Sequence, residues 1–277
     1  MLKKLIKHEW KDTWTVGTVC AVIVAVLTVI GMIIFSLDIW QESANRNNEM
    51  AEQFTSMTIM LYVMMFVWGL IGVVFVVKYY FFYRYYKNLF TDHGYLMNTL
   101  PVKSTELINA KLIVAVIWQY LIGLVVGIAI FSLIMSVLAG IGDYNFSEFM
   151  RDLGDLLREI EWSEFSEVIP FLISMFFICL LAPIGGVLLM YAAVGIGQTA
   201  KKLKFLIAVF ILIGFNIIKQ FVVSYISLPF SLLMEDAIPT NTFMNIASVI
   251  ALLVLIGVII GLYFLNRYFL EKKLNLE

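Results

Sequence analysis

The hydrophobic positions of this chain gather in six long runs that are separated by shorter polar segments. The hydrocarbon core of a bilayer is about 30 Å thick, and a helix needs about 20 predominantly apolar residues to cross it. Each run reaches that length, and none shows the alternation of a barrel strand. Because backbone groups in lipid must bond within their own segment, we predict an all-α integral membrane protein with six transmembrane helices. The predicted spans cover residues 14–37, 57–77, 112–139, 168–196, 203–228 and 243–265.

The segments between the runs are too short for a soluble domain, so residues 1–277 are predicted to form a single transmembrane domain. Residues 1–13 place apolar side chains on one helical face and lysines on another. This pattern fits a helix lying flat in the membrane interface, or a simple basic anchor for the first span. Residues 140–167 set apolar side chains at helical spacing against many acidic ones, which predicts an amphipathic helix outside the membrane.

The longest basic connection covers residues 78–111, and positions 79–86 hold seven aromatic residues and one arginine. We interpret this run as an aromatic belt at headgroup depth, on a helix continuous with the second span. Farther along, Leu96, Met97 and Leu100 form an apolar patch on one or two helical turns. Such a short helix is not stable alone in water, so it needs a surface to pack on.

Prolines mark the predicted irregularities in the later spans. Pro170 and Pro183 are expected to start or kink the fourth span, because each removes an N–H donor from the helix. The fifth span is expected to end at Pro229. Residues 229–239 are apolar but interrupted, and they are too few to cross the membrane. This favours a re-entrant or interfacial segment before the last span.

Composition agrees with lipid as the main solvent of the chain. Hydrophobic residues make up 62% and charged residues 14%, against averages of about 45–50% and about 25% in soluble proteins. The net charge of −1 gives no basic balance that would favour nucleic acid as a partner. Cys20 and Cys179 both lie in apolar runs, so they indicate neither a disulfide framework nor a metal site.

The basic residues are distributed unevenly, and this predicts the orientation of the chain. Fifteen of the 19 lysines and arginines fall in residues 1–13, 78–111, 201–204 and 267–273. Cytoplasmic segments of membrane proteins carry the excess of Lys and Arg. We therefore expect these segments and both termini to be cytoplasmic. Residues 140–167, which are rich in acidic side chains, would then be extracellular and could attract a cationic, amphipathic substrate.

A few polar side chains fall inside the predicted spans, where they are candidates for a translocation path. Asn216, Lys219 and Gln220 lie within one helical turn of each other in the fifth span, and Gln119 lies in the third. The alternative for Lys219 is that it reaches to the headgroups or pairs with an acidic residue of the 229–239 segment. The alternative for Gln119 is a hydrogen bond to a neighbouring helix.

Sequence motifs for catalysis are missing from the chain. No phosphate-binding G-x-x-x-x-G-K-[ST] loop is present, and residues 195–202, which come nearest to it, have the wrong spacing. The two histidines, His8 and His93, have no neighbouring cysteine or histidine that would suggest zinc. We therefore expect neither an enzyme nor a directly bound cofactor.

Two stretches of the sequence resemble a known family. "NLFTDHGYLMNTLPVKSTELINAKL" and the closing "YFLEKKLNLE" are similar to bacterial ABC-2 type transporter permeases, especially the small six-span subunits of Gram-positive bacteria. The resemblance implies a type V exporter-like architecture with an N-terminal interfacial helix, a cytoplasmic coupling helix and a re-entrant segment before the last span. The ATPase-coupling positions that it implies are Asp92, His93, Gly94, Tyr95, Leu96, Met97, Asn98, Thr99, Leu100 and Pro101.

The same resemblance implies partners and a function. A family member works in the bacterial cytoplasmic membrane as a dimer with a second copy or a related permease. Two copies of a separate ABC ATPase subunit bind ATP and Mg and supply the energy. The expected function is export of an amphipathic peptide, lipid or drug. The alternatives are a peptide-sensing or immunity subunit of such a complex, and a secondary transporter, which the lack of acidic residues in the core of any span disfavours.

Overall fold

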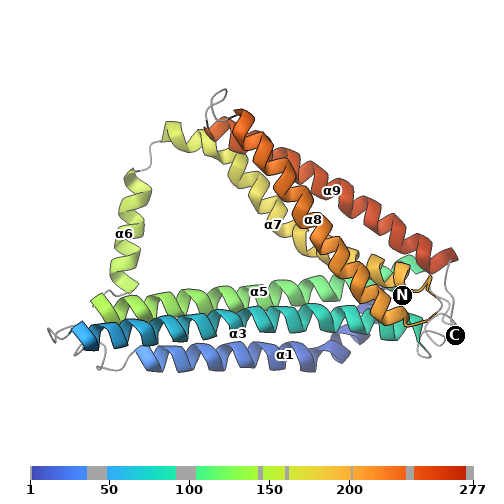
Figure 1. The fold of residues 1–277 in the computed structure, drawn as a ribbon, viewed down its shortest axis with the longest axis horizontal. Coiled ribbons are helices and arrows are strands. Elements are labelled where there is room, and N and C mark those ends of the chain that lie inside the picture. Colours follow the sequence, from blue (N-terminus) through green and yellow to red (C-terminus); the bar gives the residue numbers. More distant parts are fainter. Residues whose placement is uncertain are drawn as a thin grey trace. The chain divides into compact units, whose positions relative to one another are not determined.

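The computed structural model describes residues 2–35, 49–91, 104–142, 146–159, 162–200, 202–234 and 240–272. Within these ranges the chain forms seven α-helices and no strand, which confirms the all-α prediction. The helices are α1 (Leu2–Phe35), α3 (Glu49–Phe90), α5 (Ser104–Gly142), α6 (Phe146–Glu159), α7 (Trp162–Gly197), α8 (Lys204–Met234) and α9 (Thr240–Lys272) (Figure 1).

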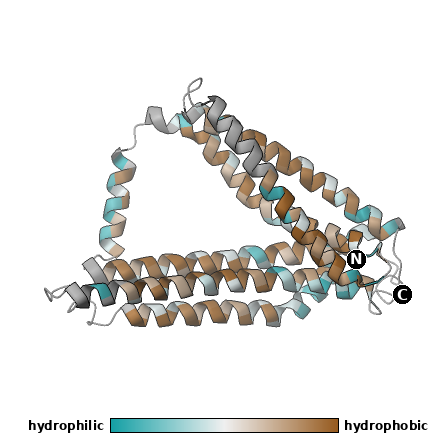
Figure 2. Cartoon of the chain, viewed as in Figure 1, coloured by the Kyte–Doolittle hydropathy of each residue, from teal (hydrophilic) through white to brown (hydrophobic). Residues whose placement is uncertain are grey.

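All of these helices except α6 are long and apolar enough to cross a membrane, which confirms the six predicted spans. Hydrophobic residues cover most of their length, whereas hydrophilic ones concentrate near helix ends and on α6 (Figure 2). Large apolar side chains such as Val22, Trp68 and Leu253 are more exposed than buried. Soluble proteins rarely expose so much apolar surface, whereas membrane proteins expose such surface to the acyl chains of lipid. The chain is a multi-pass membrane protein.

Several helices extend beyond the predicted spans. Residues 2–13 are not a separate helix, because α1 runs unbroken from Leu2 through the first span. Neither Pro170 nor Pro183 starts the fourth span, since both lie inside α7. The predicted end of the fifth span at Pro229 is wrong, because α8 continues to Met234. Helices in membranes accommodate proline, because neighbouring groups and local adjustment satisfy the freed carbonyls. The rest of the predicted re-entrant segment, residues 235–239, lies outside the described residues.

The chain folds into two compact units. The first contains residues 1–10, 80–116 and 161–277, and the second contains residues 11–79 and 117–160. α1, α3 and α5 each contribute to both.

In the first unit, α7 packs along α8 and α9. Gly195 allows a close approach to α9, since a Cβ there would lie 3.1 Å from the Phe269 ring. Asn266 of α9 is buried, and its Nδ2 donates to the carbonyl oxygen of Leu188 in α7 at 2.9 Å. A side-chain amide thus links α9 to the C-terminal third of α7.

A second polar link between α7 and α9 is a serine pair. The Ser174 hydroxyl donates to Ser248 Oγ at 2.6 Å, and the Ser248 hydroxyl donates to the Asn245 carbonyl oxygen at 2.9 Å. Interhelical hydrogen bonds in membranes average only about 0.6 kcal/mol in double-mutant cycles. We therefore expect a small coupling free energy, about 0.6 kcal/mol, between Ser174→Ala and Ser248→Ala, measured from the unfolding free energies of the single and double variants. A coupling above about 2 kcal/mol would contradict this.

In the second unit, α1 approaches α5 at Gly17. A Cβ at Gly17 would lie 2.2 Å from the Trp118 ring, so only glycine fits. Trp118 is held in place because its Nε1 donates to Thr13 Oγ1 at 3.0 Å and its ring meets Trp14 edge to face at 5.9 Å. Where α1 meets α3, the Tyr62 hydroxyl donates to the Leu27 carbonyl oxygen at 3.1 Å.

Candidate functional site

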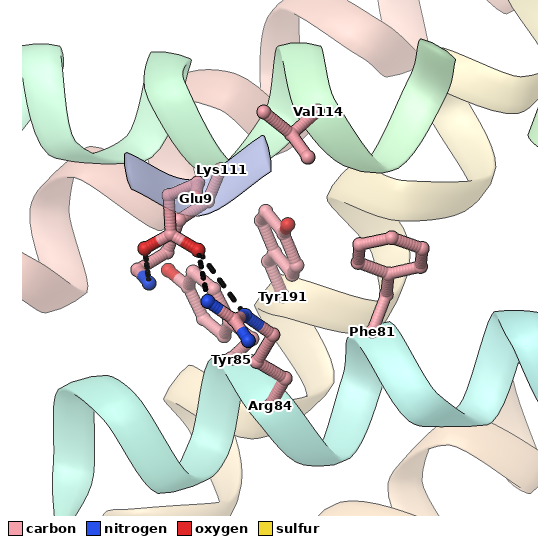
Figure 3. Close-up of a pocket in the computed structure, with 7 residues that line it drawn as sticks. All are labelled: Glu9, Phe81, Arg84, Tyr85, Lys111, Val114 and Tyr191. Carbon is pink, nitrogen blue, oxygen red and sulfur yellow. Dashed lines mark hydrogen bonds and ion pairs between the residues drawn. The ribbon is translucent and has the colours of Figure 1, made fainter. Parts of the chain in front are cut away.

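A buried cluster of charged side chains lies in the first unit, where α1, α3 and α5 meet (Figure 3). Glu9 of α1 is only 4% exposed, and its carboxylate accepts hydrogen bonds from two cations. Arg84 of α3 donates to Glu9 Oε2 from Nε at 3.1 Å and from Nη2 at 2.9 Å. Lys111 of α5, itself buried, donates from Nζ to Glu9 Oε1. We call Glu9, Arg84 and Lys111 the ion cluster.

The energetics of the ion cluster follow from its burial. Removing a carboxylate from water costs several kcal/mol, and nearby opposite charges repay this cost only when the hydrogen-bond geometry is good. Both carboxylate oxygens of Glu9 receive charge-assisted bonds, which are about twice as strong as neutral ones. Any movement that separates Glu9 from a partner would leave a buried charge without compensation. The ion cluster therefore holds the three helices together at this point.

Aromatic rings line the small pocket beside the ion cluster. The rings of Tyr85 and Tyr191 stack with centroids 3.6 Å apart and planes 7° from parallel, and both residues are buried. Phe81 and Val114 complete the lining together with the charged residues (Figure 3). The Tyr80 hydroxyl accepts a hydrogen bond from Arg84 Nη1 at 3.4 Å. These rings exclude water from the cluster and strengthen its electrostatic attraction.

The aromatic run at positions 79–86 does not act as a belt throughout. It continues α3 as predicted, but Phe81, Phe82 and Tyr85 are buried against the rest of the first unit. Only Tyr79 and Tyr83 are exposed, one helical turn apart. The interpretation as a uniform headgroup belt is therefore wrong for the buried face of the helix. An unbroken aromatic run has no amphipathic period that would show which face packs.

The position of the ion cluster along the chain relates it to the predicted coupling segment. Arg84 lies six residues before α3 ends at Phe90, and Lys111 lies seven residues after α5 begins at Ser104. The cluster therefore joins the helices that lead into and out of residues 92–103. The predicted coupling positions Asp92 to Pro101 themselves lie outside the described residues.

The predicted path residues belong to different units, Asn216, Lys219 and Gln220 to the first and Gln119 to the second, and their role in a path stays a prediction. Asn216 Nδ2 donates to the Leu212 carbonyl oxygen of its own helix at 2.8 Å, so one of its two N–H groups is used locally. Lys219 and Gln220 are exposed on α8. Gln119 belongs to the second unit and is half-buried, and its Nε2 has no hydrogen-bond partner among the described residues. Within the same residues, no group of three or more His, Cys, Asp or Glu side chains could hold a metal ion.

The ion cluster could not be predicted from local sequence patterns, because its members are far apart in the chain. Arg84 lies 75 residues and Lys111 102 residues from Glu9. A signal was nonetheless present. Glu9 continues the apolar stripe of residues 2, 5 and 6 at helical spacing, and Lys111 occupies the same kind of position after Leu107 and Ile108. A charge inside an apolar stripe implies a buried partner.

No protein-family model, no curated protein and no solved structure matches this chain.

Proposed function

We propose that this chain is the membrane-spanning permease subunit of an ATP-binding cassette exporter in the bacterial cytoplasmic membrane. In this proposal two copies of a separate ATPase subunit dock on residues 92–101, and a second copy or a related permease completes the transporter. The cargo is an amphipathic peptide, lipid or drug. The six apolar helices and the lack of a phosphate-binding loop in the sequence support a permease that needs an external source of energy.

The observation that carries the proposal is the ion cluster beside the segment that would bind the ATPase. Arg84 and Lys111 lie on the two helices that flank residues 92–103, and both bind Glu9 of α1. A displacement of that segment would move α3 and α5 directly, because both are covalently continuous with it. It would reach α1 as well, because parting Glu9 from either cation exposes an unpaired buried charge. Three helices would therefore respond as one body to nucleotide-driven motion of a partner.

The charge distribution supports the same arrangement. The lysines of residues 3–11 and the basic residues that flank 92–103 belong to the segments that carry the excess positive charge. By the positive-inside rule these segments face the cytoplasm, where an ATPase has access to ATP. Both termini are cytoplasmic in this arrangement, because the number of spans is even.

Site-directed crosslinking tests the proposed docking. In a chain with Cys20 and Cys179 replaced by alanine, the variant Leu96→Cys is labelled with a photoactivatable crosslinker in native membranes, and captured proteins are identified by mass spectrometry. We expect an ABC ATPase to be captured. Met150→Cys on α6 is the matched control, since the proposal assigns α6 to the opposite face of the membrane. Equal capture of an ATPase from both positions, or none from Leu96→Cys, contradicts the proposal.

A further inference from the structure

α6 is strongly amphipathic, unlike the six spans. The charged residues of this helix whose side chains are described fall on one side, and the large apolar residues fall on the other. These charged residues are Glu148, Arg151, Asp152, Asp155 and Arg158. Such segregation over four helical turns is typical of helices that lie at a boundary between an apolar and an aqueous phase.

The other described helices of the second unit do not cover the apolar side of α6. Phe146 is 59%, Met150 49% and Leu156 63% exposed. Phe149 contacts α5, where its ring meets Phe131 edge to face with centroids 5.6 Å apart. A water-facing helix would be expected to bury such a stripe against its own protein. The stripe therefore needs an apolar partner from outside the second unit.

Phe131 connects this stripe to an exposed apolar surface of α5. On α5, Leu124, Ile128 and Phe131 follow each other at helical spacing and are all exposed, as expected of side chains that face acyl chains. The Phe131–Phe149 contact makes the apolar side of α6 continuous with this lipid-facing surface. Continuity with lipid favours the bilayer itself, rather than a protein, as the partner of the stripe.

The direction of α6 agrees with this partner. Within the second unit, α6 turns away from the C-terminal end of α5 and lies crosswise to it (Figure 1). Because α5 crosses the membrane, a helix crosswise to it at its end runs along the membrane plane. A helix in that plane can bury one long side in lipid while the other side stays in water.

We propose that α6 is a lipid-binding helix that lies in the headgroup region, on the membrane face where α5 ends. Its apolar stripe enters the boundary between headgroups and acyl chains, and its carboxylates remain in water. The helix would thereby fix the depth of the C-terminal end of α5 in the bilayer. This inference does not depend on the proposed transport function, since it uses only the spans and the geometry of the second unit.

Spin labelling of the whole chain in lipid nanodiscs tests the proposal. Cys20 and Cys179 are replaced by alanine, and single labels are attached at Met150→Cys on the apolar side of α6 or at Asp155→Cys on its charged side. Ile128→Cys on α5 gives the reference for lipid exposure. Collisions with oxygen, which enters lipid, and with a nickel chelate, which stays in water, are measured by power saturation.

We expect the ratio of oxygen to nickel accessibility at Met150→Cys to exceed that at Asp155→Cys at least about fivefold and to approach that at Ile128→Cys. Equal ratios at the two α6 positions would place the whole helix in water and overturn the proposal. So would low accessibility to both reagents at Met150→Cys, since a protein would then cover the stripe. If spin–spin broadening at Met150→Cys disappears on dilution with unlabelled chain, that protein is a second copy. Phe146→Cys repeats the test at a second apolar position.

Discussion

Replacing Glu9 with alanine is expected to lower the free energy of unfolding by about 3–5 kcal/mol, the range found when one partner of a buried ion pair is removed. Arg84 and Lys111 would remain in the protein interior without the carboxylate that now accepts their hydrogen bonds. The measurement is reversible unfolding of the purified chain in mixed micelles, followed by circular dichroism. An unfolding free energy within 1 kcal/mol of the unmodified protein would show that the cluster does not hold the helices together.

An exposed ion pair provides the control for this prediction. Arg267 and Glu271 lie one turn apart on α9, and Arg267 Nε is 2.8 Å from Glu271 Oε1. Their side chains are 47% and 39% exposed. Exposed pairs of this kind contribute about 0.3–0.5 kcal/mol. The variant Glu271→Ala should therefore change stability by less than about 0.5 kcal/mol, although it too removes the carboxylate of an ion pair.

A triple variant separates the structural role of the ion cluster from its proposed role in transport. Buried ion pairs can often be replaced by apolar residues of similar volume without loss of stability. We expect Glu9→Leu combined with Arg84→Met and Lys111→Met to regain most of the stability lost in Glu9→Ala. If this variant also transports its cargo at the normal rate, packing alone suffices to join the three helices. Lost transport with retained ATPase binding would show that the charges themselves are required.

Replacing Gly17 with valine is expected to destabilise the second unit by about 3 kcal/mol, at the upper end of the usual cost of overpacking. Even the first carbon of any side chain would lie 2.2 Å from Trp118, so the ring must move. Movement would break its hydrogen bond to Thr13 and its contact with Trp14. Gly17→Ala should show the same effect at a smaller size, about 1–2 kcal/mol. Both are measured by the same unfolding assay.

Gly123 provides the matched control, because it lies on α5 and a Cβ there would meet no atom within 4 Å. Alanine is the better helix former by up to about 1 kcal/mol. Gly123→Ala should therefore leave stability unchanged or raise it slightly. Were Gly17→Val as stable as the unmodified protein, α1 and α5 would not be packed through Trp118 as the structure has them.

The number of spans could be predicted from the sequence, because the thickness of the hydrocarbon sets the length of an apolar run. The ends of the helices could not. Hydropathy reports only the part of a helix inside lipid, whereas α1 and α3 continue beyond it into packed protein. Pro183 and Pro229 suggested interruptions, because a proline removes a hydrogen bond wherever it occurs. Whether the helix continues depends on its neighbours, which a sequence does not display.

The candidate site was predictable only in outline. The basic segments around residues 92–103 could be identified from charge alone, but the residues that bind each other could not. Glu9 was one acid among several lysines, and only its position on the helix distinguished it from Asp12, which lies at an exposed position. The difference is the apolar stripe that Glu9 shares with residues 2, 5 and 6. Glu9 becomes part of the ion cluster because α3 and α5, which follow much later in the sequence, bury its carboxylate and supply its two cations.

The separation of 102 residues in sequence between Glu9 and Lys111 also constrains biosynthesis. A ribosome adds roughly 5–20 residues per second, so the carboxylate of Glu9 leaves it roughly 5–20 s before the ammonium group that it finally binds. During that interval the nascent first helix must keep this anion in water or among headgroups. The N-terminal turns of α1 can enter their final position only after the third hydrophobic segment has reached the bilayer.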